Sequence, residues 1–227
     1  MASTVSAALF ALQDPAYRAF HCKLIPTIDP GRVIGVRTPV LRQFARRFAQ
    51  TDGAAPFLQQ LPHHYYEENN LHAFLLEQIR DFDACAAAVD AFLPFVDNWA
   101  TCDALKPPAL GKNLPALDAR IDGWLRAAHP FTVRFGINMR MTHFLGAAFR
   151  PAQAAAIAAL RSDDYYVSMG AAWYFATALA FQRDAIWPVF TAQQLPVWTH
   201  NKAIRKCIES RRISAADKAA LREMRRR

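Results

Sequence analysis

Helical spacing of apolar residues runs through nearly the whole chain and constrains the fold more than any other feature. After Pro39, apolar side chains recur at Val40, Leu41, Phe44 and Phe48, which places them on one face of a helix. Only 8 of the 227 residues are glycine, and no segment alternates apolar and polar residues as a half-buried strand does. The sequence therefore predicts an all-α protein.

Capping residues and prolines set the predicted helix boundaries. Asp14-Pro15 and Thr38-Pro39 each have the pattern of an N-cap followed by proline at the first helical position. We expect helices at residues 66–79, 82–95, 114–127, 132–145, 151–160, 165–181, 184–190, 197–208 and 214–224. Helices of medium length joined by short connectors favour an α-α superhelix (solenoid) of antiparallel helix pairs, in one domain over 1–227. A compact helical bundle is the alternative.

Positive charge is concentrated late in the chain. The formal net charge is +8 and the sequence pI is about 9.6. Residues 1–129 hold 12 Lys and Arg against 13 Asp and Glu, whereas residues 130–227 hold 15 against 6. Such an excess indicates an acidic partner, namely nucleic acid, a membrane surface or an acidic protein. The alternative is a solvated helix face followed by a basic tail.

Several signals are missing. No apolar run approaches the ~20 residues of a membrane span, and the start of the chain lacks the features of a signal peptide. The four cysteines are scattered, which is typical of a cytoplasmic protein with reduced thiols. The sequence has no H-E-x-x-H, Cys/His cluster, G-x-S-x-G or glycine-rich phosphate loop. We therefore expect no metal, no cofactor and no membrane partner.

Three stretches contain candidate site residues. In a helix, Trp99 and Asp103 lie one turn apart, and an aromatic ring beside a carboxylate suits a cation. The alternative is a core tryptophan, with Asp97 and Asp103 as helix caps. Arg134 lies in an apolar helix, where it needs a carboxylate or phosphate; a structural ion pair is the alternative. Trp173 follows Gly170-Ala171-Ala172, which allows a neighbouring helix to approach closely, and taken alone it fits a position in the core.

A fourth stretch combines aromatic, amide and basic residues on one predicted helix. It begins at Trp198-Thr199-His200-Asn201-Lys202 and continues to Ser210-Arg211-Arg212. This composition fits contact with phosphate groups, and it also fits a solvated terminal cap.

Six stretches, taken in their order along the chain, resemble one protein family. They are Lys23-Leu24-Ile25-Pro26, Ile34-Gly35-Val36-Arg37-Thr38-Pro39-x-Leu41-Arg42, Tyr66-Glu67-Glu68-x-x-Leu71, Asp97-Asn98-Trp99-x-x-Cys102-Asp103, Tyr165-Tyr166-Val167-x-Met169-x-x-Ala172-Trp173-Tyr174 and His200-Asn201-Lys202-Ala203-Ile204-x-Lys206-x-x-Glu209-Ser210-x-Arg212. From about Pro15 to Arg212 the chain resembles the HEAT-like-repeat DNA alkylation repair family, the AlkD-type alkylpurine DNA glycosylases.

The resemblance implies a basic concave face of stacked HEAT-like helix pairs that holds duplex DNA with alkylated bases. It implies hydrolysis of the N-glycosidic bond of cationic N3- or N7-alkylated purines by a monomer without metal or cofactor. Asp103 matches the catalytic carboxylate, Trp99 an aromatic facing the lesion, and Arg134 an arginine that supports the carboxylate and contacts DNA. The other expected DNA contacts are Trp173, Arg37, Arg42, Lys202, Arg205, Lys206, Arg211 and Arg212.

The N-terminal part departs from the pattern of the active members. Those members carry an additional helix that grips DNA before the Gly-Val-Arg-Thr-Pro turn, whereas here residues 17–27 lead straight into Asp29-Pro30-Gly31. The chain thus resembles a subgroup with a short N-terminus. The alternative function is a non-catalytic HEAT-like scaffold that binds nucleic acid or a protein, and a third is a peptide-binding solenoid.

Overall fold

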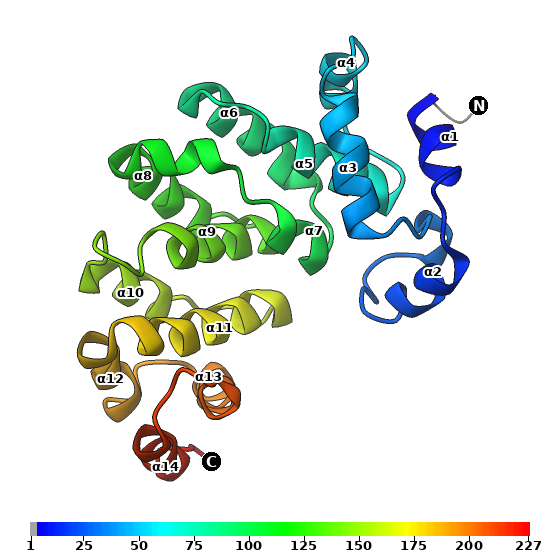
Figure 1. Ribbon diagram of the computed structural model, residues 1–227. Coiled ribbons are helices and arrows are strands. Elements are labelled where there is room, and N and C mark those ends of the chain that lie inside the picture. Colours follow the sequence, from blue (N-terminus) through cyan, green and yellow to red (C-terminus); the bar gives the residue numbers. More distant parts are fainter. Residues whose placement is uncertain (1–3) are drawn as a thin grey trace. The chain divides into compact units, whose positions relative to one another are not determined.

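The computed structural model describes residues 4–227, and this part of the chain forms helices and loops without a strand (Figure 1). The α-helices are α1 (Thr4–Phe10), α2 (Pro15–His21), α3 (Thr38–Phe48), α4 (Ala54–Gln59), α5 (Tyr66–Leu76), α6 (Phe82–Phe92), α7 (Trp99–Ala104), α8 (Leu114–Leu125), α9 (Pro130–His143), α10 (Pro151–Ala158), α11 (Tyr165–Phe181), α12 (Arg183–Thr191), α13 (Val197–Glu209) and α14 (Ala215–Glu223). Three short 3₁₀ helices are η1 (Pro30–Arg32), η2 (Leu93–Phe95) and η3 (Pro108–Lys112). The predicted all-α class is confirmed.

Capping side chains fix several helix starts. The Asp14 side chain accepts a hydrogen bond from the Tyr17 N–H and caps α2, as predicted. Asp164 does the same for α11, whose bounds are those expected from the sequence. The start of α3 differs, because Thr38 is its first helical residue and no side chain caps it. The start of α9 also differs, since the His129 side chain accepts from an N–H of the first turn and the helix begins at Pro130.

The chain divides into two compact units, with the boundary between Asn113 and Leu114. In the first unit every residue of α5 is buried, and α1, α3, α4, α6 and α7 all contact this helix. A helix that is buried on all sides is the centre of its unit. The prediction of a single domain over 1–227 stays a prediction.

A buried carboxylate ties the connector before α3 to α5. Glu67 accepts hydrogen bonds from the backbone N–H groups of Ile34, Gly35 and Val36, at 2.8, 2.7 and 3.2 Å. Gly35 has a φ of +96°, and a Cβ there would lie 2.4 Å from the Cβ of Arg18. The turn therefore needs glycine for both its backbone conformation and its close approach to α2.

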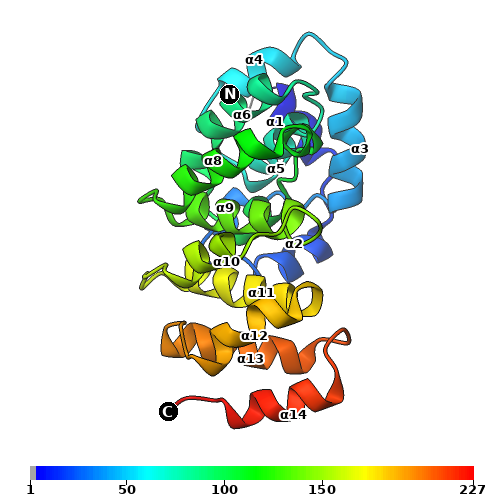
Figure 2. The same cartoon turned by 90° about the vertical axis from the view of Figure 1, so that its left-hand side faces the viewer.

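The second unit consists of helices in two rows (Figures 1 and 2). The helices α9, α11 and α13 follow one another in contact, α8 packs on α9, and α10 and α12 pack on α11. This is the arrangement of stacked helix pairs in an α-α superhelix. A Cβ at Gly170 of α11 would lie 3.5 Å from Arg134 Cγ and Ile137 Cδ1, which is an ordinary van der Waals distance, so an especially close approach at Gly170-Ala171-Ala172 stays a prediction. No helix within residues 4–227 combines the length and apolarity needed to cross a membrane.

Candidate functional site

The short helix α7, which carries Trp99 and Asp103, is anchored by a buried polar network. The side chain of Asn98 is fully buried and accepts a hydrogen bond from the Thr101 N–H, at 2.8 Å, so that it caps α7. The Thr101 hydroxyl donates in turn to Asn70 Oδ1 of α5, also at 2.8 Å. Because buried polar groups with satisfied partners have little freedom to shift, this network fixes α7 on α5.

Trp99 has one part in the core and another at the surface. Its indole Nε1–H donates to the Leu24 carbonyl oxygen at 2.8 Å, which holds the ring in one orientation. The half-buried ring packs against a cluster formed by Ile25, Ile28, Val33 and Tyr66. Trp99 therefore combines the two alternatives left open by the sequence, since it contacts the core and keeps part of its ring exposed.

Asp103 is part-buried in the same short helix, one turn after Trp99, as the sequence predicted. The α7 N-cap is Asn98, so the alternative reading of Asp97 and Asp103 as caps does not apply to this helix start. Asp97 instead forms an ion pair with Arg32, with 3.2 Å between Oδ2 and Nη2.

Beneath Trp99, a chain of polar groups that sequence reasoning missed connects α2 to α5. His21 Nε2 lies 2.8 Å from the Tyr66 hydroxyl, and His21 Nδ1 lies 3.4 Å from the Tyr17 hydroxyl. Burial lowers the pKa of His21 and raises the pKa of Tyr66 above its ordinary value. The only signal in the sequence was the spacing of four residues between Tyr17 and His21, which is too common to be diagnostic.

Arg134 of α9 lies in the second unit and is only 4% exposed. Its Nη1 donates a hydrogen bond to the Tyr166 carbonyl oxygen at 2.8 Å, and its side chain runs along Gly170. The sequence predicts a carboxylate or a phosphate as the partner of Arg134, whereas this acceptor is a backbone carbonyl oxygen. Contact of Arg134 with a phosphate stays a prediction.

The two basic residues predicted to contact DNA from the first unit have acidic partners. Arg37 Nε lies 2.7 Å from Asp14 Oδ2. Arg42 Nη1 lies 2.6 Å from Glu77 Oε2, and its guanidinium lies 3.9 Å from the centre of the Phe74 ring. Pairing of this kind reduces the charge that each residue offers to a partner, and their contact with DNA stays a prediction.

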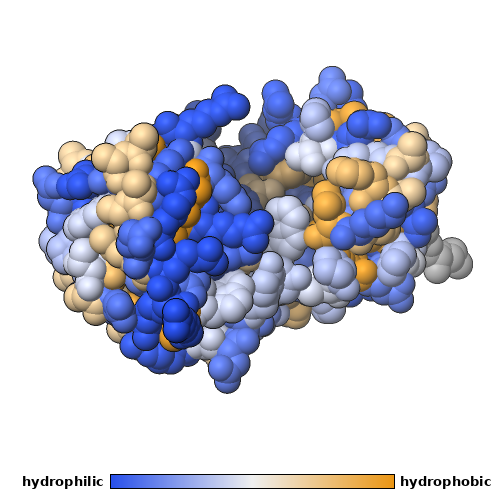
Figure 3. Space-filling model, turned by 90° about the horizontal axis from the view of Figure 1, so that it is seen from below, coloured by the Kyte–Doolittle hydropathy of each residue, from blue (hydrophilic) through white to orange (hydrophobic). Residues whose placement is uncertain are grey.

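Of the basic residues predicted to contact DNA from α13 and the turn after it, two lie against aromatic rings and one is paired with a carboxylate. Lys202 Nζ lies 5.8 Å from the Trp198 ring centre, and the Arg212 guanidinium lies 5.1 Å from that of Phe181. Arg205 bonds Glu209 at 3.0 Å. Figure 3, seen from the α14 side, shows hydrophilic side chains over much of the surface where α13 and α14 face the viewer. Arg211, in the turn after α13, is exposed.

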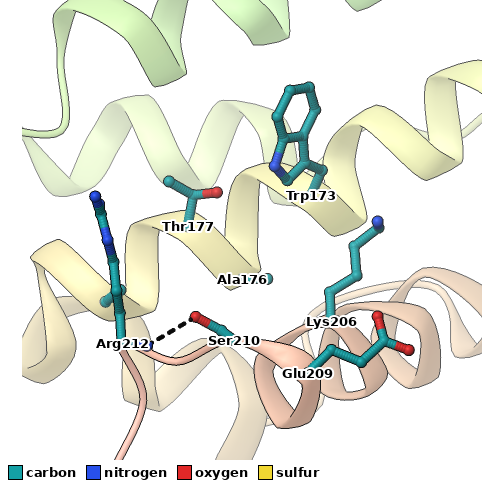
Figure 4. Close-up of a pocket in the computed structure, with 8 residues that line it drawn as sticks. Trp173, Ala176, Thr177, Lys206, Glu209, Ser210 and Arg212 are labelled. Carbon is teal, nitrogen blue, oxygen red and sulfur yellow. Dashed lines mark hydrogen bonds between the residues drawn. The ribbon is translucent and has the colours of Figure 1, made fainter.

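A pocket of about 350 Å³ lies between α11 and α13 (Figure 4). Its lining residues are Trp173, Ala176, Thr177, Ala180, Lys206, Glu209, Ser210 and Arg212. The structure thus brings three of the predicted contacts together, namely Trp173, Lys206 and Arg212. Trp173 is half-buried and forms one wall, so it is not a fully enclosed core residue.

Two polar residues of the last motif have a structural role that the sequence did not reveal. His200 is fully buried, and its Nε2 lies 2.9 Å from the Met224 carbonyl oxygen. Asn201 donates to the Arg226 carbonyl oxygen and accepts from the Arg226 N–H, at 2.7 and 2.9 Å. These side chains hold the end of the chain against α13.

Within residues 4–227 no three His, Cys, Asp or Glu side chains gather into a group that suits a metal ion. The four cysteines are free thiols, and burial raises the pKa of Cys85 to about 11 and that of Cys207 to about 12. Thiols of this kind are poor nucleophiles at neutral pH.

Comparison with known proteins agrees with the motifs. No individual curated protein has a sequence that matches this chain. Residues 5–188 match the family described as DNA alkylation repair enzyme. The match includes Trp99, Asp103, Arg134 and Trp173, and it ends before α13. The chain therefore belongs to the DNA alkylation repair enzyme family.

Proposed function

We propose that this protein hydrolyses the N-glycosidic bond of purines alkylated at N3 or N7 in duplex DNA, with Asp103 as the catalytic carboxylate. The observation that carries the proposal is the placement of Trp99 and Asp103 one turn apart on α7, a helix locked by the buried Asn98 cap. Membership in a family of DNA alkylation repair enzymes supports the choice of substrate.

Hydrolysis of this N-glycosidic bond requires little from the protein beyond one carboxylate. Alkylation at N3 or N7 makes the purine a cation, so the base leaves with the electrons of the C1′–N bond and needs no protonation. The sugar becomes oxocarbenium-like, and a water molecule adds to C1′ and loses a proton. A carboxylate at the position of Asp103 stabilises the positive charge on the sugar and accepts that proton.

Trp99 supplies a ring face to the cationic base. Its indole N–H is already used by the Leu24 carbonyl oxygen, so the group it offers to a ligand is the π-face of the ring. Such a face attracts a cation, with an energy of about 0.5–2 kcal/mol. We assign Trp99 to the lesion for this reason.

The basic residues of the second unit would hold the DNA backbone. We assign Arg134 to DNA contact, with its guanidinium oriented by the hydrogen bond to Tyr166. Each neutralised phosphate releases counterions, so binding through these residues weakens as salt concentration rises.

The test is the release of 7-methylguanine and 3-methyladenine from methylated duplex DNA. We expect Asp103→Asn to lower the rate by about 10²-fold or more, because an amide cannot stabilise the sugar cation or take the proton. The matched control is Asp163→Asn, which removes the same charge from an exposed position before α11. DNA affinity and the circular dichroism spectrum should be unchanged in both variants.

Equal rates for the wild type and Asp103→Asn would contradict the proposal. Salt-dependent DNA binding by a folded wild-type protein that releases no base would instead identify a non-catalytic scaffold.

A further inference from the structure

Aromatic rings and cations gather on the face formed by α11 and α13. We propose that the pocket between these helices binds an unpaired nucleotide of single-stranded nucleic acid, with its base against Trp173 and its phosphates at Lys206 and Arg212. This site goes beyond the proposed glycosylase activity, since it needs neither a duplex nor an alkylated base.

The pocket has the size and the lining of a small-ligand site. Its volume of about 350 Å³ lies within the range of about 300–1,000 Å³ for ligand pockets. In Figure 4, Lys206 reaches up on the Trp173 side, and Arg212 extends on the side of Thr177. A ring between two cations suits a planar base joined to phosphate groups.

The charge within the pocket is positive. The ammonium group of the Lys206 side chain has no hydrogen-bond or ion-pair partner within the described residues, and the Arg212 guanidinium contacts the Phe181 ring without a carboxylate. The one acidic residue of the lining, Glu209, bonds Arg205 at 3.0 Å. Two cations are therefore left for an anionic ligand.

Ser210 adds a hydrogen-bond donor to these two charges. Its hydroxyl oxygen accepts from the backbone N–H of Arg212 at 3.2 Å, which shapes the turn after α13 (Figure 4). A serine hydroxyl that accepts one hydrogen bond still carries its own hydrogen. Ser210 thus presents a donor to a phosphate oxygen.

Exposed aromatic rings flank the pocket on the same helix pair. Tyr165, Trp198 and Phe181 are 53%, 45% and 52% exposed. Tyr165 and Trp198 lie at the N-terminal ends of α11 and α13, with 5.6 Å between their ring centres. Phe181 is the last residue of α11. Rings that alternate with cations along a groove are typical of single-strand sites, because every base offers a face for stacking.

An unpaired strand fits these observations better than a duplex. In a duplex the base faces are stacked on one another, and a protein reaches phosphates and groove edges. The Trp173 ring in the wall of this pocket cannot stack on bases whose faces are already covered by their neighbours in a duplex. The cations Lys206 and Arg212 also lie beyond residue 188, where the family match ends.

The experiment measures fluorescence anisotropy of a labelled, unmodified thymidine oligonucleotide of about ten nucleotides. Unlabelled competitors are the same strand, its duplex with an adenine strand, and free thymidine monophosphate. The variants are Trp173→Ala, Trp173→Phe, Lys206→Gln and Arg212→Gln. Arg222→Gln on α14 is the charge-matched control, because Arg222 is exposed and does not line the pocket.

We expect Trp173→Ala to weaken binding about tenfold and Trp173→Phe to restore much of the loss. Lys206→Gln and Arg212→Gln should each lower the salt slope by about 0.7, and Arg222→Gln should leave it unchanged. Any one of three results would overturn the proposal: equal single-strand affinity of the wild type and Trp173→Ala, a loss of duplex affinity in Trp173→Ala as large as its loss of single-strand affinity, or a loss in Arg222→Gln as large as in Lys206→Gln. Equal competition by the free nucleotide would overturn the assignment to a strand.

Because the probe carries no alkylated base, this result is independent of base release. A protein that releases alkylated bases and yet binds no single strand would leave the proposed function intact and refute the pocket assignment.

Discussion

His63 Nε2 and His72 Nδ1 lie 2.9 Å apart in the core of the first unit, and both side chains are buried. The His63 ring stacks on Phe57 with 4.3 Å between ring centres, and the His72 ring stacks on Phe92 at 4.1 Å. One imidazole donates to the other, so the pair is satisfied when both rings are neutral. Adding one proton to each neutral ring would place two buried cations in contact.

This pair makes stability depend on pH. Burial, together with the neighbouring His63, lowers the pKa of His72 to about 3, and burial lowers the pKa of His63. Between pH 6.5 and about 3 the unfolded chain binds protons that the folded chain does not. The free energy of unfolding therefore falls as the pH falls below 6.5, by up to about 1.4 kcal/mol per pH unit for His72, and the lowered pKa of His63 acts in the same direction.

The measurement is urea denaturation at pH 7 and pH 5. We expect His72→Asn, whose amide can replace the Nδ1 contact, to show a smaller difference between the two pH values than the wild type. The control is His64→Asn, a change at the exposed neighbouring histidine. An unchanged difference in His72→Asn would show that the pair does not set the acid sensitivity.

Two helical glycines are expected to respond in opposite ways to alanine. A Cβ at Gly170 meets Arg134 and Ile137 at 3.5 Å or more, which is ordinary van der Waals contact. Gly170→Ala should therefore stabilise the protein by about 0.5–1 kcal/mol through helix propensity. At Gly136 the new Cβ would lie 3.2 Å from Trp124 Cβ, so α8 and α9 must separate and the gain is lost.

Thermal denaturation of the two alanine variants separates the outcomes. A higher Tm for Gly170→Ala than for Gly136→Ala is the expected order. The reverse order would mean that the space beside Gly170 is smaller than its neighbours indicate.

Trp99→Phe removes the hydrogen bond to Leu24 and keeps a ring on the apolar cluster. Because this bond lies at the surface, water can replace it, and the free energy of unfolding should fall by no more than about 1 kcal/mol. Base release should fall several-fold, since the ring loses its fixed orientation and phenylalanine binds cations less well than tryptophan. The control is Trp187→Phe on α12, a half-buried tryptophan whose indole makes no hydrogen bond within residues 4–227. An equal loss of activity in both variants would argue against a specific role of Trp99.

Local signals were enough to predict most of the helices. The capping Asp164 and the run of apolar residues after it define α11 completely, because both act within one segment. The helix α9 starts two residues before the predicted position 132, because His129 caps it and Pro130 is its first residue. The expected extension of α5 to residue 79 also failed, as the helix ends at Leu76.

The candidate site could be predicted only where it depends on spacing along one helix. Trp99 and Asp103 share α7 as expected. The hydrogen bond from Trp99, however, is accepted by Leu24, and no local sequence pattern indicates such a contact. The same holds for Asn70, which receives its hydrogen bond from Thr101 of another helix. Contacts between distant segments depend on tertiary packing, which a single sequence does not specify.

Asn201 illustrates this limit and carries the last prediction. Its amide makes two hydrogen bonds to the backbone of Arg226, one in each direction. Asn201→Ala removes both, so the amide of Arg226 should exchange with solvent faster, while the free energy of unfolding falls by about 1 kcal/mol. Hydrogen exchange measured by NMR tests this, with Lys202→Ala on the same helix as the control. Unchanged exchange at Arg226 in Asn201→Ala would show that other contacts, such as that of His200 with Met224, suffice to hold the tail.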